Sequence, residues 1–105
     1  MDKRVPEVIR PMLQAYLDQL EQQLPGFVES VYLHGSIALG AFDEQRSDID
    51  FITLIRRIET TEEAIKLYTQ LINIHQTLSK DYPRWLFEGS YLQIPYPGQQ
   101  KPPLL

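Results

Sequence analysis

The chain has 105 residues, of which 43% are hydrophobic and 23% charged, and its formal net charge is −4. This length is that of one small domain, and the net acidity argues against binding long nucleic acids, which requires a basic surface. Without cysteine, disulfides and thiolate metal sites are excluded; no stretch resembles a signal peptide or a membrane span, so we expect a cytoplasmic protein.

The first regular element expected is an amphipathic helix in the N-terminal quarter of the chain. Apolar residues recur there three and four positions apart, which is typical of a helix with one buried face. They are Val8, Ile9, Met12, Leu13, Tyr16, Leu17, Leu20 and Leu24. Pro6 suits a helix start, Pro11 either delays or kinks the regular helix, and Pro25-Gly26 ends it.

Two strands are expected next, separated by a polar segment. Ser30–Leu33, with some extension before it, has strand-forming residues and is broken by His34-Gly35-Ser36. Residues 37–40 suggest one short helical turn, and residues 43–47 a loop. The run Asp48–Ile55 first alternates carboxylate and apolar residues and then becomes wholly apolar. This pattern predicts a buried central strand whose start faces a polar environment.

A second helix and a third strand complete the expected order. Thr60 and Glu63 have the spacing of a capping box, and apolar residues at helical spacing follow as far as Leu78. Pro83 closes this connection, and residues 85–94 suggest a strand, after which prolines exclude regular structure. The order helix, strand, strand, helix, strand predicts an α/β (α+β) domain with a small mixed sheet flanked by helices.

Gly35-Ser36 is a candidate phosphate-binding turn. A strand that ends in this pair and runs into a short helix presents free backbone N–H groups and a hydroxyl at a helix N-terminus, and glycine permits close approach. Taken alone, such a pair is more often an ordinary turn. Arg46, in the loop that follows, precedes the aspartate pair and is a further candidate to contact a phosphate, although a solvated loop arginine is the commoner case.

Asp48 and Asp50 form the candidate metal site. Their two-residue spacing on a strand directs both carboxylates to one face. Two like charges side by side are costly unless a cation lies between them, and carboxylates next to a phosphate turn suit Mg²⁺ binding through substrate phosphates. An isolated pair of this kind would be interpreted as solvated, but Gly35-Ser36 just upstream favours the metal site.

These two motifs together resemble the signature of the DNA polymerase beta-like nucleotidyltransferase superfamily. The residues concerned are Gly35-Ser36 and Ser47-Asp48-Ile49-Asp50. A wider stretch, from Leu24 through Phe51 and on to residues 94–97, is similar to the streptomycin/spectinomycin adenylyltransferases of the aminoglycoside 3''-type. The resemblance covers most of the chain. It implies a nucleotidyltransferase fold, ATP as substrate, AMP transfer to a hydroxyl of a small molecule such as an aminoglycoside, and a role in antibiotic resistance.

The resemblance also implies roles for individual residues. Gly35 and Ser36 would hold the β- and γ-phosphates of ATP, with Arg46 and Ser47 as further nucleotide-binding candidates.

Acidic residues would supply the metal ligands and the base. Asp48 and Asp50 would coordinate two Mg²⁺ ions in a two-metal mechanism. The family needs a third carboxylate on a later strand as metal neighbour and general base, and Glu88 matches that place. An exposed strand carboxylate is an equally weighted interpretation of Glu88.

Other candidates have structural interpretations that we favour. His75 falls in the middle of a helix and is expected at the surface or the edge of the core. Trp85 and Tyr91 could stack on adenine, but aromatic residues in strands usually belong to the core. Arg56-Arg57 follows the central strand and is expected to be solvated.

The chain departs from this family at its C-terminus. The adenylyltransferases carry a C-terminal helical domain that shapes the acceptor site, whereas residues 1–105 provide only the nucleotidyltransferase domain. We therefore expect that a C-terminal domain is missing or that the protein is a dimer. The activity of the isolated chain is in doubt, because a site that lacks part of its wall does not close over an acceptor and exclude water. No membrane or nucleic-acid partner is expected.

Two further functions stay open at the level of sequence. One is a minimal nucleotidyltransferase that modifies a protein partner, as antitoxin-like members of the superfamily do, and the short chain fits that reading. The other is a catalytically inactive nucleotide-binding or interaction module. Loss of the third carboxylate would favour this last alternative.

Overall fold

The computed structural model of the chain describes residues 5–33 and 48–94. The element order is η1 (Glu7–Ile9), α1 (Arg10–Gln23), β1 (Val28–Leu33), β2 (Asp48–Ile55), α2 (Thr61–Asp81) and β3 (Leu86–Gln93). This is the order that the sequence predicts. The expected turn and loop between the first two strands, and the proline-rich C-terminal stretch, lie outside the described residues.

Helix α1 starts where its prolines allow. Pro11 occupies one of the first two helical positions, where a missing N–H leaves no hydrogen bond unmade. The short 3-10 turn η1 precedes it, so Pro11 delays the regular helix and does not kink it. After the helix ends, Gly26 adopts a φ of 74°, a conformation that glycine reaches without steric cost.

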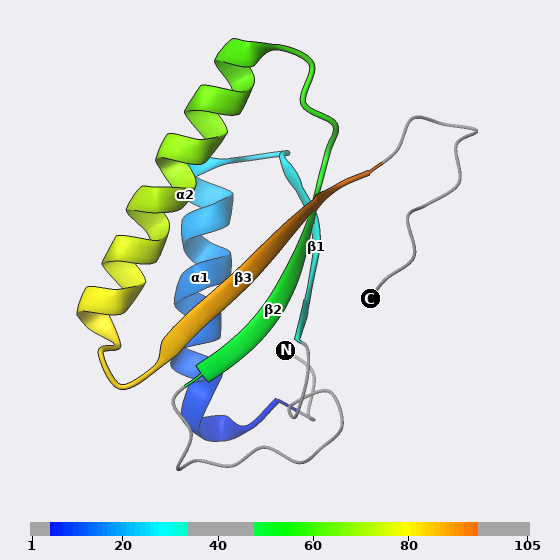
Figure 1. Cartoon of the computed structure of the whole chain (residues 1–105). Coiled ribbons are helices and arrows are strands. Elements are labelled where there is room, and N and C mark those ends of the chain that lie inside the picture. Colours follow the sequence, from blue (N-terminus) through cyan, green and yellow to red (C-terminus); the bar gives the residue numbers. More distant parts are fainter. Residues whose placement is uncertain (1–4, 34–47, 95–105) are drawn as a thin grey trace.

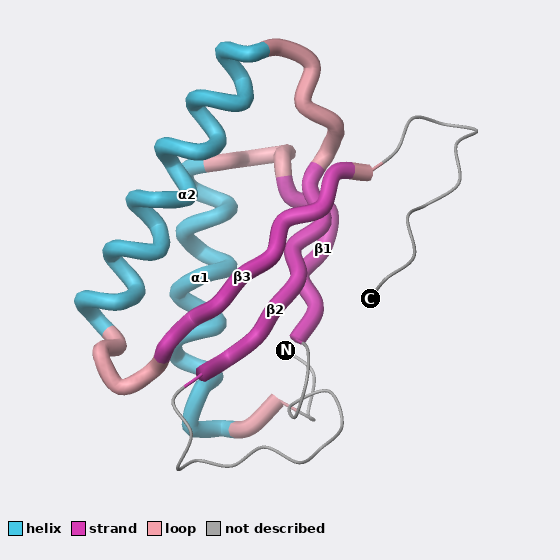
Figure 2. The backbone as a smooth tube through the Cα atoms, viewed as in Figure 1, coloured by secondary structure: helices cyan, strands magenta, loops and turns pink. Residues whose placement is uncertain are grey.

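The three strands form one mixed sheet in the order β1-β2-β3 (Figure 2). Strands β1 and β2 are antiparallel, with an irregularity between Val28 and Ser30. Strands β2 and β3 are parallel, because α2 carries the chain back to the starting end of β2. The central strand predicted at Asp48–Ile55 is therefore confirmed.

The two faces of the sheet differ in character. In β2, Ile49, Phe51, Thr53 and Ile55 are buried, whereas the residues between them are half-buried or, at Asp48, exposed. Both helices lie on one side of the sheet (Figure 1), and the buried residues of β2 face them. We call the opposite side, which no helix within the described residues covers, the open face. The predicted flanking helices are thus confirmed, but both cover the same face.

The start of α2 is stabilised by a capping box. The side chain of Thr60 accepts a hydrogen bond of 3.1 Å from the backbone N–H of Glu63, and the Glu63 carboxylate accepts one of 3.0 Å from Glu59. This confirms the cap predicted from the spacing of Thr60 and Glu63.

Neither α2 nor any other helix in the described ranges is long and apolar enough to cross a membrane.

Candidate functional site

Asp48 and Asp50 lie at the start of the central strand, on the open face of the sheet. Their side chains alternate with those of Ile49 and Phe51, which are buried on the helix side. Asp48 is exposed and Asp50 is half-buried. The two carboxylates therefore share one face, as their spacing predicts.

Glu88 lies beside Asp50. The parallel register of β2 and β3 pairs the two residues directly, which puts both side chains on the open face. A hydrogen bond with the carboxyl group of Asp50 is the main cause that raises the pKa of Glu88, followed by desolvation and by the charges of Asp50 and Asp48.

Strand β1 ends next to these carboxylates. Leu33, its last residue, pairs with Phe51, the neighbour of Asp50. The segment that follows Leu33 contains four predicted nucleotide-binding residues, and Ser47 directly precedes Asp48 in the chain. These four, Gly35, Ser36, Arg46 and Ser47, lie outside the described residues, so their place at the site stays a prediction.

An aromatic layer supports the carboxylates from the helix side of the sheet. Phe51 follows Asp50, Phe87 precedes Glu88, and the two rings stack with their centroids 4.0 Å apart. Gly89 makes room for this contact, because a Cβ atom built there would lie 2.0 Å from Cζ of Phe51. Both strands are thus anchored immediately next to their acidic residues.

The chemistry of the three side chains fits a hard divalent cation. Carboxylate oxygens are the protein ligands that Mg²⁺ prefers, and Mg²⁺ usually takes one or two of them together with substrate phosphates and water. In residues 5–33 and 48–94, no group of three or more histidine or acidic residues is close enough to hold a metal on its own. Asp48 and Asp50 therefore fit as partial ligands, not as a complete cage.

A second polar cluster lies on the helix side of the sheet. The hydroxyl of Tyr16, on α1, is 2.8 Å from Oγ1 of Thr53 and 2.9 Å from the hydroxyl of Tyr91. Nε2 of His75, on α2, is 2.6 Å from the same Tyr91 hydroxyl. Burial raises the pKa of Tyr16 and Tyr91 and lowers the pKa of His75. We call these four residues the tyrosine cluster.

The structure supports the structural interpretations of the aromatic candidates. Trp85 is a buried core residue, and Tyr91 belongs to the tyrosine cluster, so neither ring lies on the open face with the carboxylates. His75 is at the edge of the core, as expected, but its hydrogen bond to Tyr91 was not foreseen. The one sequence signal for the cluster is Thr53, a polar residue in a buried strand that must find a partner.

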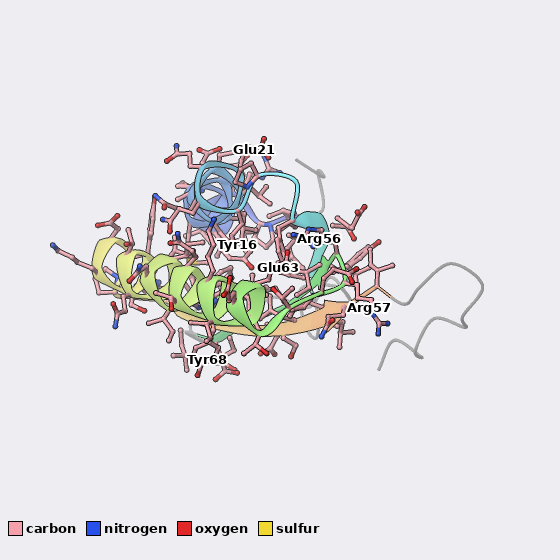
Figure 3. The ribbon with its side chains drawn as sticks, turned by 90° about the horizontal axis from the view of Figure 1, so that it is seen from above. Tyr16, Glu21, Arg56, Arg57, Glu63 and Tyr68 are labelled. Carbon is pink, nitrogen blue, oxygen red and sulfur yellow. The ribbon has the colours of Figure 1, made fainter. Side chains whose placement is uncertain are left out.

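Arg56 has structural partners of its own. It forms an ion pair with Glu63, which lies beside it in Figure 3. Its guanidinium also lies 4.2 Å from the centre of the Phe27 ring. It follows the end of β2, roughly 20 Å along the strand from Asp50 at ~3.3 Å per residue. This placement supports the structural interpretation of Arg56 over a phosphate clamp at the carboxylates.

Comparison with known proteins identifies the family of the chain. A family profile described as a nucleotidyltransferase domain matches residues 13–88, more than two thirds of the chain. The match begins in α1 and extends to Glu88, so it includes all three carboxylates. No curated protein and no solved structure matches the chain.

Proposed function

The chain belongs to the nucleotidyltransferase domain family, and from this premise we propose that it transfers AMP from ATP to a hydroxyl group of a small molecule. One observation carries the proposal: Asp50 and Glu88 are register partners on the open face of the sheet, and Asp48 lies on the same face. Two carboxylates at the start of the central strand, with a third beside them on the neighbouring strand, suit a reaction among phosphates and metal ions.

In the proposed site, Asp48 and Asp50 hold divalent cations, with Mg²⁺ as the expected metal and two ions as the expected number. Bound Mg²⁺ would supply charge neutralisation for the phosphate oxygens. The two aspartates would fix the position of the cations, because both side chains project from the same face of β2. Buried residues on the other face hold that strand in place.

Glu88 is proposed as the general base. The acceptor hydroxyl oxygen forms a bond to the α-phosphorus of ATP, the bond from that phosphorus to the bridging oxygen breaks, and pyrophosphate leaves. The proton of the acceptor hydroxyl passes to the Glu88 carboxylate. A base in this role must lie within hydrogen-bond reach of the attacking oxygen, and Glu88 stands directly beside the metal-binding Asp50.

The β- and γ-phosphates are proposed to bind at Gly35 and Ser36, with Arg46 and Ser47 alongside. These residues belong to the segment that joins β1 to β2. Because Leu33 at the end of β1 pairs with Phe51, this segment starts and ends beside the carboxylates, which supports the proposal.

The proposed acceptor is an aminoglycoside-like compound, on the strength of the resemblance to the streptomycin/spectinomycin adenylyltransferases. The protein is proposed to act in the cytoplasm and to complete its acceptor site with a further domain or a second copy.

The test uses ATP labelled either at the α-phosphate or at the γ-phosphate. The protein is incubated with Mg²⁺, labelled ATP and a panel of aminoglycosides, polyols and test proteins. We expect the α-label on a small-molecule acceptor together with released pyrophosphate, and no γ-label on any product. Transfer of the γ-label would identify a phosphotransferase instead, and α-label on protein would favour the protein-modifying alternative. Absence of α-label transfer to every acceptor would contradict the proposal.

A further inference from the structure

The tyrosine cluster joins four elements of the fold through its hydroxyl groups. Tyr16 comes from α1, Thr53 from β2, Tyr91 from β3 and His75 from α2. Figure 3 shows Tyr16 in the layer between the two helices. Tyr16 and Thr53 are fully buried, and in the described part of the chain every buried polar side-chain atom has a hydrogen-bond partner. The cluster is therefore a complete network, which fixes its members more firmly than apolar packing does.

The cluster shares its strand register with the carboxylates. Thr53 is paired with Tyr91 across β2 and β3, just as Asp50 is paired with Glu88. Thr53 lies three residues after Asp50 in β2, and Tyr91 lies three residues after Glu88 in β3. A slip of one residue between the strands would break both pairings and move each side chain to the other face.

Tyr16 contacts both strands of this register pair. Its single hydroxyl lies within hydrogen-bond distance of both Thr53 and Tyr91, so it spans the two strands from the helix side. His75 holds the same Tyr91 hydroxyl from α2, the helix that connects β2 to β3. Two helices thus fix the position of β3 relative to β2 at one point.

We infer that Tyr91 and Thr53 are positioning residues for nucleotidyl transfer: their hydroxyls hold β3 in the register that sets Glu88 beside Asp50. This inference rests on the proposed function of those carboxylates. Neither hydroxyl touches the substrate, because both lie on the helix side of the sheet. Their effect reaches the reaction through the placement of Glu88.

The experiment compares variants that differ by a hydroxyl. Tyr91→Phe keeps the ring, Thr53→Val keeps the shape of the side chain, and Thr53→Ser keeps the hydroxyl. Tyr68→Phe is the matched control, because Tyr68 is 69% exposed on the outer side of α2 (Figure 3). The rate of α-label transfer and the amide hydrogen exchange of β2 and β3 are measured for each.

We expect Tyr91→Phe and Thr53→Val to lower kcat by about tenfold or more while KM for ATP stays within about twofold, because misplacing a group by about 1 Å can cost on the order of 100-fold in rate. Thr53→Ser restores most of kcat, and Tyr68→Phe leaves it unchanged. Folded Tyr91→Phe and Thr53→Val with wild-type kcat, or with a change in KM alone, would overturn the inference.

Hydrogen exchange separates this inference from the proposed function. If the wild-type protein transfers no label, the proposed function fails, yet the register claim is still decided. Faster exchange of the β2–β3 amides in Tyr91→Phe than in Tyr68→Phe supports the claim that the hydroxyl fixes the register. Equal exchange in the two variants overturns it.

Discussion

Asp50 and Glu88 are direct register partners across the parallel strands β2 and β3. Residues so distant in the chain meet because α2 returns the backbone to the start of β2 before β3 begins. The parallel register then sets the two side chains on the same face of the sheet. The candidate site thus depends on a tertiary feature, the crossover through α2, as much as on the Asp48-Ile49-Asp50 motif.

Glu88→Gln is expected to preserve ATP binding and to lower transfer by about 100-fold or more, the usual contribution of a general base. The amide keeps the size of the side chain but accepts no proton. The rate of α-label transfer and the affinity for ATP are measured side by side. Glu29→Gln, which changes an exposed carboxylate of β1, serves as the control. Normal turnover of Glu88→Gln would show that Glu88 is only a strand residue.

Gly89→Ala is expected to destabilise the fold by about 1–3 kcal/mol, the usual cost of overpacking. The added methyl group would collide with the ring of Phe51. The free energy of unfolding is measured in urea for the wild type and for the variant. In a Phe51→Leu background the same substitution should cost less, because the ring is gone. An equal cost in both backgrounds would contradict the proposed collision.

Thr60→Ala is expected to destabilise the protein by about 1 kcal/mol, because it removes the side-chain cap of α2. Urea unfolding again gives the measurement. Thr69→Ala is the control, since Thr69 is exposed and its hydroxyl bonds only to the carbonyl of Ile65 within the same helix. If the two substitutions cost the same, the cap has no special effect on stability.

The free energy of unfolding is expected to decrease below about pH 6.5, in part because of His75. Burial lowers the pKa of His75 in the folded protein from its ordinary value of 6.5. The groups around its ring are Tyr16, Phe51, Phe87 and Tyr91, none of which carries a charge at this pH. The unfolded chain therefore takes up this proton at a higher pH than the folded one. The stability that the neutral ring contributes is full above about pH 6.5 and is lost as the pH falls towards the lower, folded pKa.

Urea unfolding at about pH 7.5 and about pH 5.5, applied to the wild type and to His75→Gln, measures this effect. The variant should lose less stability than the wild type over this interval. An identical loss in both proteins would show that His75 is not responsible.

Local patterns in the sequence predicted the elements well. The capping spacing located the start of α2, and the run Asp48–Ile55 predicted both the bounds of β2 and the face of its aspartates. Strand β1 starts at Val28, within the extension that was expected before Ser30, and Val28 pairs with Ile55 before the irregularity. How far that extension reaches depends on a partner strand, which a local pattern does not contain.

Contacts between distant residues were predicted less well. Glu88 was proposed from a family resemblance and as the acidic residue within the third strand, whose pairing with the Asp48–Asp50 strand was expected to bring it to the same face. No periodicity reveals which residue a parallel strand sets directly beside Asp50. The hydrogen bonds of Tyr16 with Thr53 and Tyr91 were missed for the same reason: each of these residues, taken alone, fits an ordinary core position. Their polar groups show that a partner is needed but not which one it is.

The metal dependence of ATP binding tests the central claim most directly. Calorimetry is carried out with Mg²⁺ and with a chelator on the wild type, on Asp50→Asn and on Asp81→Asn, which alters an exposed carboxylate at the end of α2. We expect the wild type and Asp81→Asn to bind ATP more tightly with Mg²⁺, and Asp50→Asn to lose that gain, because the amide no longer balances the charge of the cation. Equal ATP affinity of the wild type with and without Mg²⁺, or an undiminished Mg²⁺ effect in Asp50→Asn, would contradict the account.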